Sequence, residues 1–355
     1  MVFARLAVLV ALAASHLTNA AIIKRFACST GQTTTNEACC KLFPIVDQIQ
    51  KDLFDGGECG EEAHSALRLA FHDAIGFSLQ VRYSNRGGGA DGSLLAFNTT
   101  ETAFSTTDDI VASQFPVFLE SGLSAGDFVH LAAAIGTGNC PGAPKLDFFF
   151  GRPDPVAPAP DRTVPEPTDS VTAILSRFAD AGFSPSEVVA LLASHTIAAA
   201  DQIDPSIPGT PFDSTVGTFD SQVFLEVLLK GTLFPGNGPQ SGEVESPIAG
   251  EMRLQSDFAI SQDSRTACLW QNMIDNQNVM ASAFKAAMSK LQVLGQSDLI
   301  DCSDVVPVPA SFDGPIKYPA SFSQSDVQIA CAESPFPSLA TVEGPAPTLA
   351  PVPGS

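Results

Sequence analysis

Two hydrophobic stretches of the sequence carry histidines at positions where they could do chemistry. In the first, Leu67–Asp73, Arg68 and His72 are four residues apart, so on a helix both side chains project from one face. A guanidinium and an imidazole are costly to bury together without a task. Such a pair could accept a proton from a bound peroxide and stabilise the charge that develops as its O–O bond polarises. The alternative is a salt-bridged surface arginine beside a histidine of the core.

His195 closes the second stretch, Leu191–Thr196. A neutral imidazole there could be the axial ligand of a haem iron. A carboxylate on its other nitrogen would make it a more basic ligand, and Asp257 is the candidate partner. The alternative is a histidine that only interacts with the dipole at a helix C-terminus.

Two clusters of acidic and hydroxyl residues begin directly beside these histidines. Asp73 is followed by the loop 87–93, and Thr196 is followed by the segment 212–220. Carboxylate, hydroxyl and carbonyl oxygens in such numbers favour Ca²⁺, and an ion there would hold each helix end in place. Neither cluster follows the EF-hand pattern, so ordinary Asx or glycine turns are the alternative.

The elements that must position these residues are mostly helices. Hydrophobic residues recur at helical spacing in 40–53, 64–75, 108–120, 125–135, 171–181, 186–200, 219–229 and 279–291. Ser184, Pro185 and Glu187 form a capping-box pattern at one helix start. The segments 152–167 and 204–211 are Pro-rich loops, and an extended tail begins near Ser334. We expect a predominantly α-helical unit, with two lobes around a cleft and very little β-structure.

The N-terminus and the cysteines indicate secretion. Residues 1–25 read as a signal peptide followed by a short propeptide that ends at Lys24-Arg25. The eight cysteines predict four disulfides, which spacing alone cannot pair, and Asn98 begins a glycosylation sequon. The formal net charge of −21 argues against nucleic acids and membrane surfaces as partners. We expect a soluble, extracellular protein.

These motifs together resemble the secreted fungal haem peroxidases, the group of manganese, lignin and versatile peroxidases. The resemblance rests on Arg68-Leu-x-Phe-His72-Asp73, Gly88-Gly-Ala-Asp91-Gly-Ser93, Leu192-Ala-Ser-His195-Thr and Pro211-Phe-Asp213-Ser-Thr, and it runs from about Cys28 to Pro337. It implies a two-lobed helical fold over residues 26–337, with haem b between a distal and a proximal helix, and residues 338–355 as an extended tail. His195 would be the axial ligand with Asp257 behind it, and His72 and Arg68 the catalytic distal pair.

The resemblance also implies disulfides and two calcium ions. The implied disulfides are Cys28–Cys40, Cys39–Cys302, Cys59–Cys140 and Cys268–Cys331. The distal calcium would take Asp73, Gly89, Asp91 and Ser93, and the proximal one Thr196, Asp213, Thr215, Thr218 and Asp220.

Departures from the family pattern concern the reductant. Members that oxidise Mn²⁺ have three carboxylates near a haem propionate; Glu61 and Asp201 match two, while Ser65 occupies the third position. Two carboxylates should bind a hard dication more weakly than three. The alternative is that Glu61 is a helix-start carboxylate and Asp201 a solvated one.

Other departures affect electron transfer and peroxide activation. Ala190 stands where the lignin and versatile branches have an exposed tryptophan, and Trp270 looks structural, so that long-range route is absent. Tyr83 is a candidate surface oxidation site or an ordinary loop aromatic. The family asparagine that orients the distal histidine is replaced by the segment Ser105-Thr106-Thr107, which leaves open what holds that imidazole.

The expected function is a monomeric peroxidase for lignin degradation. It would use hydrogen peroxide to oxidise phenols or dyes at the haem edge, and Mn²⁺ at the incomplete site. The main alternative is a generic low-potential peroxidase without useful Mn²⁺ oxidation. A secreted calcium-binding protein without enzymatic activity would not need Arg68 and His72, and a metallohydrolase would need a ligand cluster such as HExxH.

Overall fold

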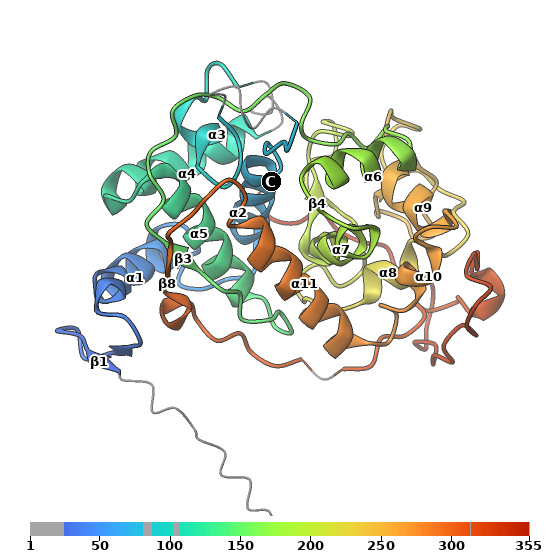
Figure 1. Cartoon of the computed structure of the whole chain (residues 1–355). Coiled ribbons are helices and arrows are strands. Elements are labelled where there is room, and N and C mark those ends of the chain that lie inside the picture. Colours follow the sequence, from blue (N-terminus) through green and yellow to red (C-terminus); the bar gives the residue numbers. More distant parts are fainter. Residues whose placement is uncertain (1–24, 81–86, 102–106, 313, 355) are drawn as a thin grey trace, which may run out of the picture.

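The computed structural model of the chain describes residues 25–80, 87–101, 107–312 and 314–354, and helices dominate it (Figure 1). The α-helices are α1 (Phe43–Asp52), α2 (Glu61–Ala74), α3 (Ser93–Ala96), α4 (Asp108–Ser121), α5 (Ala125–Asn139), α6 (Val171–Asp180), α7 (Pro185–Leu191), α8 (Gln222–Glu226), α9 (Gln255–Gln262), α10 (Ala267–Gln271) and α11 (Gln277–Leu291). Short 3₁₀ helices are η1 (Glu37–Leu42), η3 (Leu192–Ile197), η4 (Ser303–Val305) and η5 (Gln324–Asp326). Among the described residues, no helix combines the length and the apolar character needed to cross a membrane.

The β-structure consists of two-residue strands in antiparallel pairs. These pairs are β1 (Phe26–Ala27) with β2 (Thr33–Thr34), β3 (Phe149–Phe150) with β8 (Ile300–Asp301), β4 (Ala199–Ala200) with β5 (Thr210–Pro211), and β6 (Glu243–Val244) with β7 (Arg253–Leu254). They tie loops together and build no extended sheet. The expectation of a predominantly α-helical chain is confirmed.

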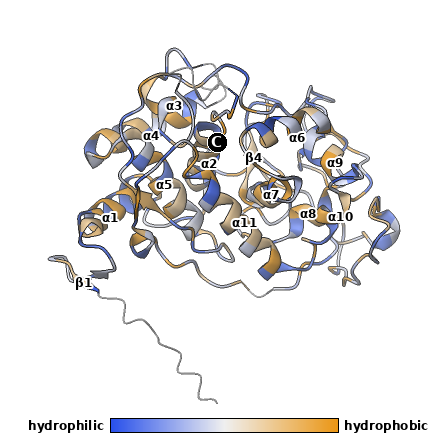
Figure 2. Cartoon of the chain, viewed as in Figure 1, coloured by the Kyte–Doolittle hydropathy of each residue, from blue (hydrophilic) through white to orange (hydrophobic). Residues whose placement is uncertain are grey.

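The helices form two groups, with α1 to α5 on one side and α6 to α10 on the other, and α11 runs between them (Figure 1). Hydrophobic residues concentrate on the helices, while hydrophilic residues are frequent in the loops (Figure 2). At the centre of the first group, α5 is buried along nearly its whole length and packs against α2. Small residues permit this approach: a Cβ on Gly136 would lie 3.1 Å from Cα of Ala63. Close packing fixes α2, which carries the candidate distal residues.

The prediction of one helix over residues 186–200 is correct in its first half and wrong in its second half. The capping box is present, since Ser184 caps the backbone of Glu187 and the Glu187 carboxylate accepts from the Ser184 amide. However, α7 ends at Leu191, the chain tightens into η3 up to Ile197, and β4 follows. Two further helices are shorter than expected: α1 begins only at Phe43, and α8 spans Gln222–Glu226. Helical spacing of hydrophobic residues therefore located these elements but did not distinguish α-helix from 3₁₀ turns.

Four disulfides cross-link the described chain. They are Cys28–Cys40, Cys39–Cys302, Cys59–Cys140 and Cys268–Cys331, the pairs that the family resemblance implies. The Cys39–Cys302 bond spans 263 residues and ties η1 to the segment after α11. Such a long closed loop restricts the unfolded chain strongly.

The described part of the C-terminal tail, residues 338–354, is extended and lies against the helical body. Its Thr348 bridges Ala249, and the amide of Val352 donates to the carbonyl of Gly209 (2.8 Å). Val352 is buried, and a Cβ on Gly354 would lie 3.8 Å from Cβ of Glu61. The chain end consequently lies beside α2, as Figure 1 shows.

Candidate active site

A cavity of about 530 Å³ lies between the two groups of helices. α2 supplies Arg68 and His72 to its wall, and η3 supplies His195. Apolar side chains line much of the rest, among them Leu67, Phe71, Val188, Leu192, Phe212, Ile260 and Met288. The size and the mostly apolar wall with a few convergent polar groups are typical of a cofactor site.

The α2 wall follows from helical spacing. Ala63, Ala66 and Ala70 are buried on the side toward the core, which leaves Arg68 and His72 on the side that lines the cavity. Burial, with a smaller contribution from the Arg68 charge, lowers the pKa of His72 to about 3. The imidazole is therefore neutral near neutral pH and able to accept a proton. Its Nδ1 is buried and has no hydrogen-bond partner among the described residues.

Arg68 remains the cation of this wall. Burial lowers its pKa from the usual value, while the charges of Asp201 and Asp109 act in the opposite direction. A guanidinium stays protonated under these conditions. The wall thus offers a neutral base and a fixed positive charge four residues apart.

On the opposite wall, Nδ1 of His195 lies 2.6 Å from Oδ2 of Asp257. Asp257 is buried in the first turn of α9, and β4 and β5 pair directly after the 3₁₀ turn that carries His195. The ring of Phe212 contacts the imidazole at a centroid distance of 5.3 Å. Because Nδ1 is engaged by a carboxylate, the other ring nitrogen is left to bind a metal, which is the arrangement expected of a metal-ligating histidine.

The distal acidic cluster contains buried oxygen atoms without hydrogen-bond partners among the described residues. These atoms are Oδ1 of Asp73 and Oγ of Ser93. Burial raises the pKa of Asp73 to about 7, and burial together with the charge of Asp73 raises the pKa of Asp91 to about 7. Gly89 lies in the same loop with a φ of 111°. Buried carboxylates and unpartnered oxygens in one place are the donor set of a hard dication.

The proximal cluster is held together by hydrogen bonds. Oγ1 of Thr196 donates to Oδ2 of Asp213 (2.6 Å) and to Oδ1 of Asp220 (3.3 Å), and Oγ1 of Thr215 donates to both carboxylates. Burial and the neighbouring acids raise the pKa of Asp213 well above its usual range, and burial raises that of Asp220 to about 6. Thr218 lies in the same turn, where its amide donates to the carbonyl of Thr215.

The candidate manganese residues lie at the cavity edge near the C-terminal tail. Oγ of Ser65 donates to Oε1 of Glu61 (2.8 Å), so the serine orients the glutamate that it follows by one helical turn. Asp201 lines the cavity, and its Oδ1 accepts from the amide of Gly209 (2.9 Å). Gly209 in turn accepts from Val352, which links the tail to this edge.

Other residues singled out in the sequence take no direct part in the described cavity chemistry. Ala190 is buried, and Trp270 is buried with its Nε1 donating to the carbonyl of Phe224 (2.9 Å). Asn98 follows α3 beside exposed threonines. Tyr83, Ser105, Thr106 and the signal segment 1–24 lie outside the described residues, while Thr107 is buried as the cap of α4.

Several buried polar residues beside the site were missed in the sequence. Glu101 accepts from the amide of Ala159 (3.0 Å), and burial raises its pKa to about 7 next to the distal cluster. Glu226 lies beside the proximal cluster, where Ser214 donates to it. His64 lines the cavity with its pKa lowered to about 4 by burial. His64 lies on α2 one turn before Arg68, so helical spacing could have found it. No spacing rule connects Glu101 or Glu226 to the motifs, because tertiary packing brings them there.

The comparison with known proteins shows the family. Residues 45–276 match the peroxidase family, and residues 279–354 match the fungal peroxidase extension region. The chain therefore belongs to the peroxidase family, in its fungal class II branch, and it is an oxidoreductase that acts on hydrogen peroxide.

The similar proteins include representatives of three named activities. Versatile peroxidase VPS1 of Pleurotus eryngii is 56% identical over 347 residues, covering 95% of this chain and 94% of its own length. Manganese peroxidase 3 of Phlebia radiata is 53% identical, with 98% of both chains covered. Ligninase C of Trametes versicolor is 48% identical, with 90% of this chain and 89% of its own length covered.

Proposed function

We propose that this peroxidase holds haem b in the central cavity, with His195 as the iron ligand and with His72 and Arg68 as the residues that handle the peroxide. The observation that carries the proposal is the pairing of two walls. One wall presents a neutral imidazole beside a guanidinium, and the other presents an imidazole bonded to a buried carboxylate at 2.6 Å. Haem would supply the redox chemistry: peroxide would oxidise it by two electrons, and reductants would return these electrons one at a time.

The residues of the α2 wall move a proton and stabilise charge. His72 accepts the proton of one peroxide oxygen and delivers it to the other, which leaves as water. Arg68 stabilises the negative charge that develops on the departing oxygen. Overall, one hydrogen peroxide, two electrons and two protons give two waters, so each peroxide would consume two one-electron reductants.

His195 and Asp257 have a different task from the distal pair. The buried carboxylate accepts from Nδ1 and fixes the orientation and tautomer of the imidazole. A ligand polarised in this way donates more electron density to a bound iron. Replacing the carboxylate by an amide would remove that polarisation while keeping the shape.

Two Ca²⁺ ions belong to the proposed holoenzyme. The distal ion would be held by Asp73, Gly89, Asp91 and Ser93, and the proximal ion by Thr196, Asp213, Thr215, Thr218 and Asp220. The support is that each cluster gathers buried carboxylates whose pKa is raised by burial. A dication would relieve that burial of like charges.

The proposed reductants are phenols or dyes at the cavity edge and Mn²⁺ near Glu61 and Asp201. Manganese as a reductant is supported by the similarity to manganese peroxidase 3 of Phlebia radiata. Ser65 contributes a hydroxyl where a third carboxylate would be needed for tight binding, so we propose a weak manganese site. A generic peroxidase without useful Mn²⁺ oxidation is the second candidate, favoured by the same serine.

The protein is proposed to be a secreted, glycosylated monomer that takes part in lignin degradation. The four disulfides support an oxidising compartment, and the Asn98 sequon supports glycosylation. Residues 1–25 are proposed as the signal peptide and propeptide.

The test is His72→Leu in the haem-loaded enzyme. Because the base for the first proton transfer is lost, the bimolecular rate constant with hydrogen peroxide should fall by about 100- to 10,000-fold in stopped-flow absorption experiments. The control is the haem content and resting absorption spectrum, which show that the cavity remains intact. A parental rate in a variant with full haem content would remove His72 from the mechanism.

A further inference from the structure

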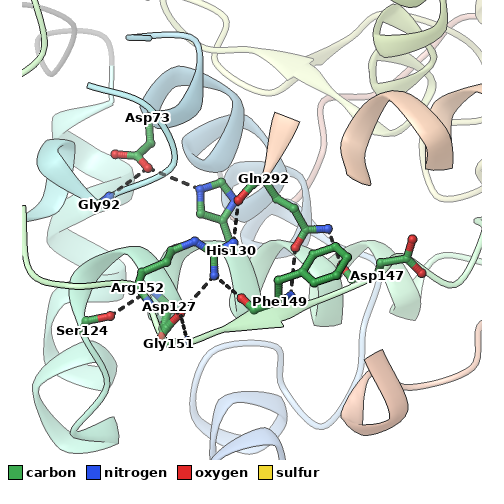
Figure 3. A network of polar contacts seen from close by, with 10 residues as sticks. All are labelled: Asp73, Gly92, Ser124, Asp127, His130, Asp147, Phe149, Gly151, Arg152 and Gln292. Carbon is green, nitrogen blue, oxygen red and sulfur yellow. Dashed lines mark hydrogen bonds and ion pairs between the residues drawn. The ribbon is translucent and has the colours of Figure 1, made fainter. Parts of the chain in front are cut away.

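His130 is a buried histidine to which the chemistry above gives no role. It lies on α5 with an exposed fraction of 3%, and its Nε2 is 3.4 Å from Oδ2 of Asp73 (Figure 3). This separation is slightly longer than the usual N–H···O range of about 2.7–3.2 Å. Nε2 makes no shorter hydrogen bond within the described residues. Because a buried polar group without a partner is unfavourable, the Asp73 carboxylate is the group that can compensate it.

The two oxygens of Asp73 have different surroundings. Oδ2 accepts from the amide of Gly92 at 2.9 Å and faces His130. Oδ1 is buried and has no hydrogen-bond partner in the described chain. The protein thus holds the carboxylate from one side and leaves the other oxygen for a cation.

α5 presents His130 from a firmly held position. One turn earlier, Asp127 pairs with Arg152 at 3.0 Å and also accepts from the amide of Gly151. Nη2 of Arg152 reaches the carbonyl of Gln292 at the end of α11 (2.6 Å). Figure 3 shows His130 between this clamp and Asp73. The His130 imidazole is therefore held by α5 and its contacts with Arg152 and α11, whereas the residue it contacts, Asp73, lies on α2.

Asp73 is the residue directly after His72. The Nδ1 of His72 has no hydrogen-bond partner among the described residues. Within the described chain, the backbone at the end of α2 and packing hold the ring, including an edge contact with Phe71 at a centroid distance of 5.9 Å. Whatever fixes Asp73 consequently fixes the base that receives the peroxide proton.

We propose that His130 is a positioning residue for peroxide activation, which orients Asp73 through Nε2 and thereby holds both the distal cation site and His72. The proposal rests on the proposed roles of His72 and of the distal calcium. His130 touches neither substrate nor haem, and it acts through Asp73. The effect of His130 is local, so the binding of a phenol at the cavity edge does not involve it.

The test compares His130→Gln with His130→Asn in the haem-loaded enzyme. The amide N–H of glutamine reaches about the place of Nε2, whereas asparagine is shorter and leaves that place empty. Both variants are polar amides, so burial of polarity is matched. Thr137→Val is the control on the same helix, because Thr137 is buried and its hydroxyl has no partner among the described residues.

Three measurements are needed, and only one is activity. The first is the rate of calcium release into excess chelator, followed with a calcium-sensitive dye. The second is the resting absorption spectrum of the haem, which reports a change in distal coordination. The third is the stopped-flow rate constant with hydrogen peroxide, beside KM and kcat for a phenol.

His130→Asn should accelerate calcium release and slow the peroxide reaction, each by about 10- to 100-fold, as is usual when a residue behind a metal ligand is lost. The KM for the phenol should stay unchanged, and His130→Gln should recover most of both losses. A parental calcium release rate and a parental spectrum in His130→Asn would overturn the proposal. Equal losses in the two variants would also overturn it. They would show that the position of the amide nitrogen does not matter and that His130 only fills space.

This failure is separate from a failure of the proposed function. If the parental protein binds no calcium, or if His72→Leu reacts with peroxide at the parental rate, the proposed function is wrong. If the parental protein behaves as proposed and His130→Asn does too, only the role of His130 is wrong. Should His130→Asn not accumulate in folded form, His130→Leu with the same calcium measurement takes its place.

Discussion

The burial of the acidic clusters predicts that calcium binding releases protons and weakens steeply in acid. Burial raises the pKa of Asp73 and of Asp91 to about 7 in the metal-free protein. A bound cation requires the ionised form, so protons and calcium compete. At pH 5 a carboxyl group with a pKa of about 7 is about 1% ionised, against about half at pH 7, which lowers the calcium affinity by about 50-fold.

The two carboxylates interact, so they titrate as a pair and not as independent groups. The expected loss of affinity between pH 7 and pH 5 therefore lies between about 50-fold for one proton and about 2,500-fold for two. Near pH 6, each calcium should displace between about one and two protons. The direction is the important part: the calcium-bound form carries fewer protons, so the stability that calcium contributes is lost as the pH falls through about 7.

Calcium affinity is a better readout than unfolding. Burial raises the pKa of the two carboxyls in the folded protein above their values in the unfolded chain. Their contribution to the free energy of unfolding of the metal-free protein therefore becomes more favourable as the pH falls. His64 and His72 have pKa values lowered to about 4 and about 3, so the unfolded chain binds more protons than the folded chain below about pH 6.5. The carboxyls and the histidines thus change the free energy of unfolding in opposite directions. The contribution of the histidines cancels when metal-free protein is compared with calcium-loaded protein.

The assay is calorimetric titration of calcium into chelator-treated, desalted enzyme at pH 6, in buffers of different ionisation enthalpy. The difference in apparent heat gives the number of protons released. Asp91→Asn should release fewer protons, and Asp263→Asn is the control, because Asp263 lies on the surface in an ion pair with Arg265. Calcium binding without proton release at pH 6, or an affinity that is flat between pH 7 and pH 5, would refute the reasoning.

Three further predictions concern the other parts of the site. Asp257→Asn should lower the peroxide rate constant and speed haem loss, each by about 10- to 100-fold, and unchanged values would exclude polarisation of His195 by that carboxylate. Ser65→Glu should lower the KM for Mn²⁺ at least about tenfold while phenol oxidation stays constant. Asp201→Ala should abolish saturable Mn²⁺ oxidation. Parental Mn²⁺ kinetics in both variants would show that the ion binds elsewhere. Ending the chain after Ala350 removes the Val352 amide from Gly209, which holds Asp201, so the KM for Mn²⁺ should rise severalfold with an unchanged peroxide rate constant. An unchanged KM would mean that the tail does not support the manganese edge.

Helical periodicity located the helices, but their ends depended on features that periodicity does not contain. Arg68 and His72 share a face because they are one turn apart within a regular helix, which spacing predicts directly. His195 was expected to close an α-helix, yet it lies in a 3₁₀ turn. The tightening follows from the strand pair formed immediately afterwards by Ala199–Ala200 and Thr210–Pro211, a tertiary contact that no local pattern announces.

The partners of the site residues were harder to predict than the residues themselves. Asp257 was named as the partner of His195, and the structure places the two side chains at hydrogen-bond distance although 62 residues separate them. In contrast, Glu101 and His130 attracted no role, because a lone acid in a polar segment and a lone histidine in a hydrophobic stretch have no diagnostic spacing. Their significance comes from burial beside Asp73, which depends on how α5 and the segment after α3 pack against α2.

The two imidazoles of the cavity differ in a way that suits opposite chemical roles. Nδ1 of His195 is bound by a buried carboxylate, which makes the ring a stronger electron donor and would also make it a poor proton shuttle. Nδ1 of His72 has no partner in the described chain, and the ring is kept neutral by burial and by Arg68. A base that must take a proton and return it within one turnover benefits from weak stabilisation of its protonated form, because strong stabilisation would trap the proton. Within the described chain the backbone and packing hold the His72 ring, and Asp73, which His130 of α5 contacts, fixes the end of α2 directly beside it.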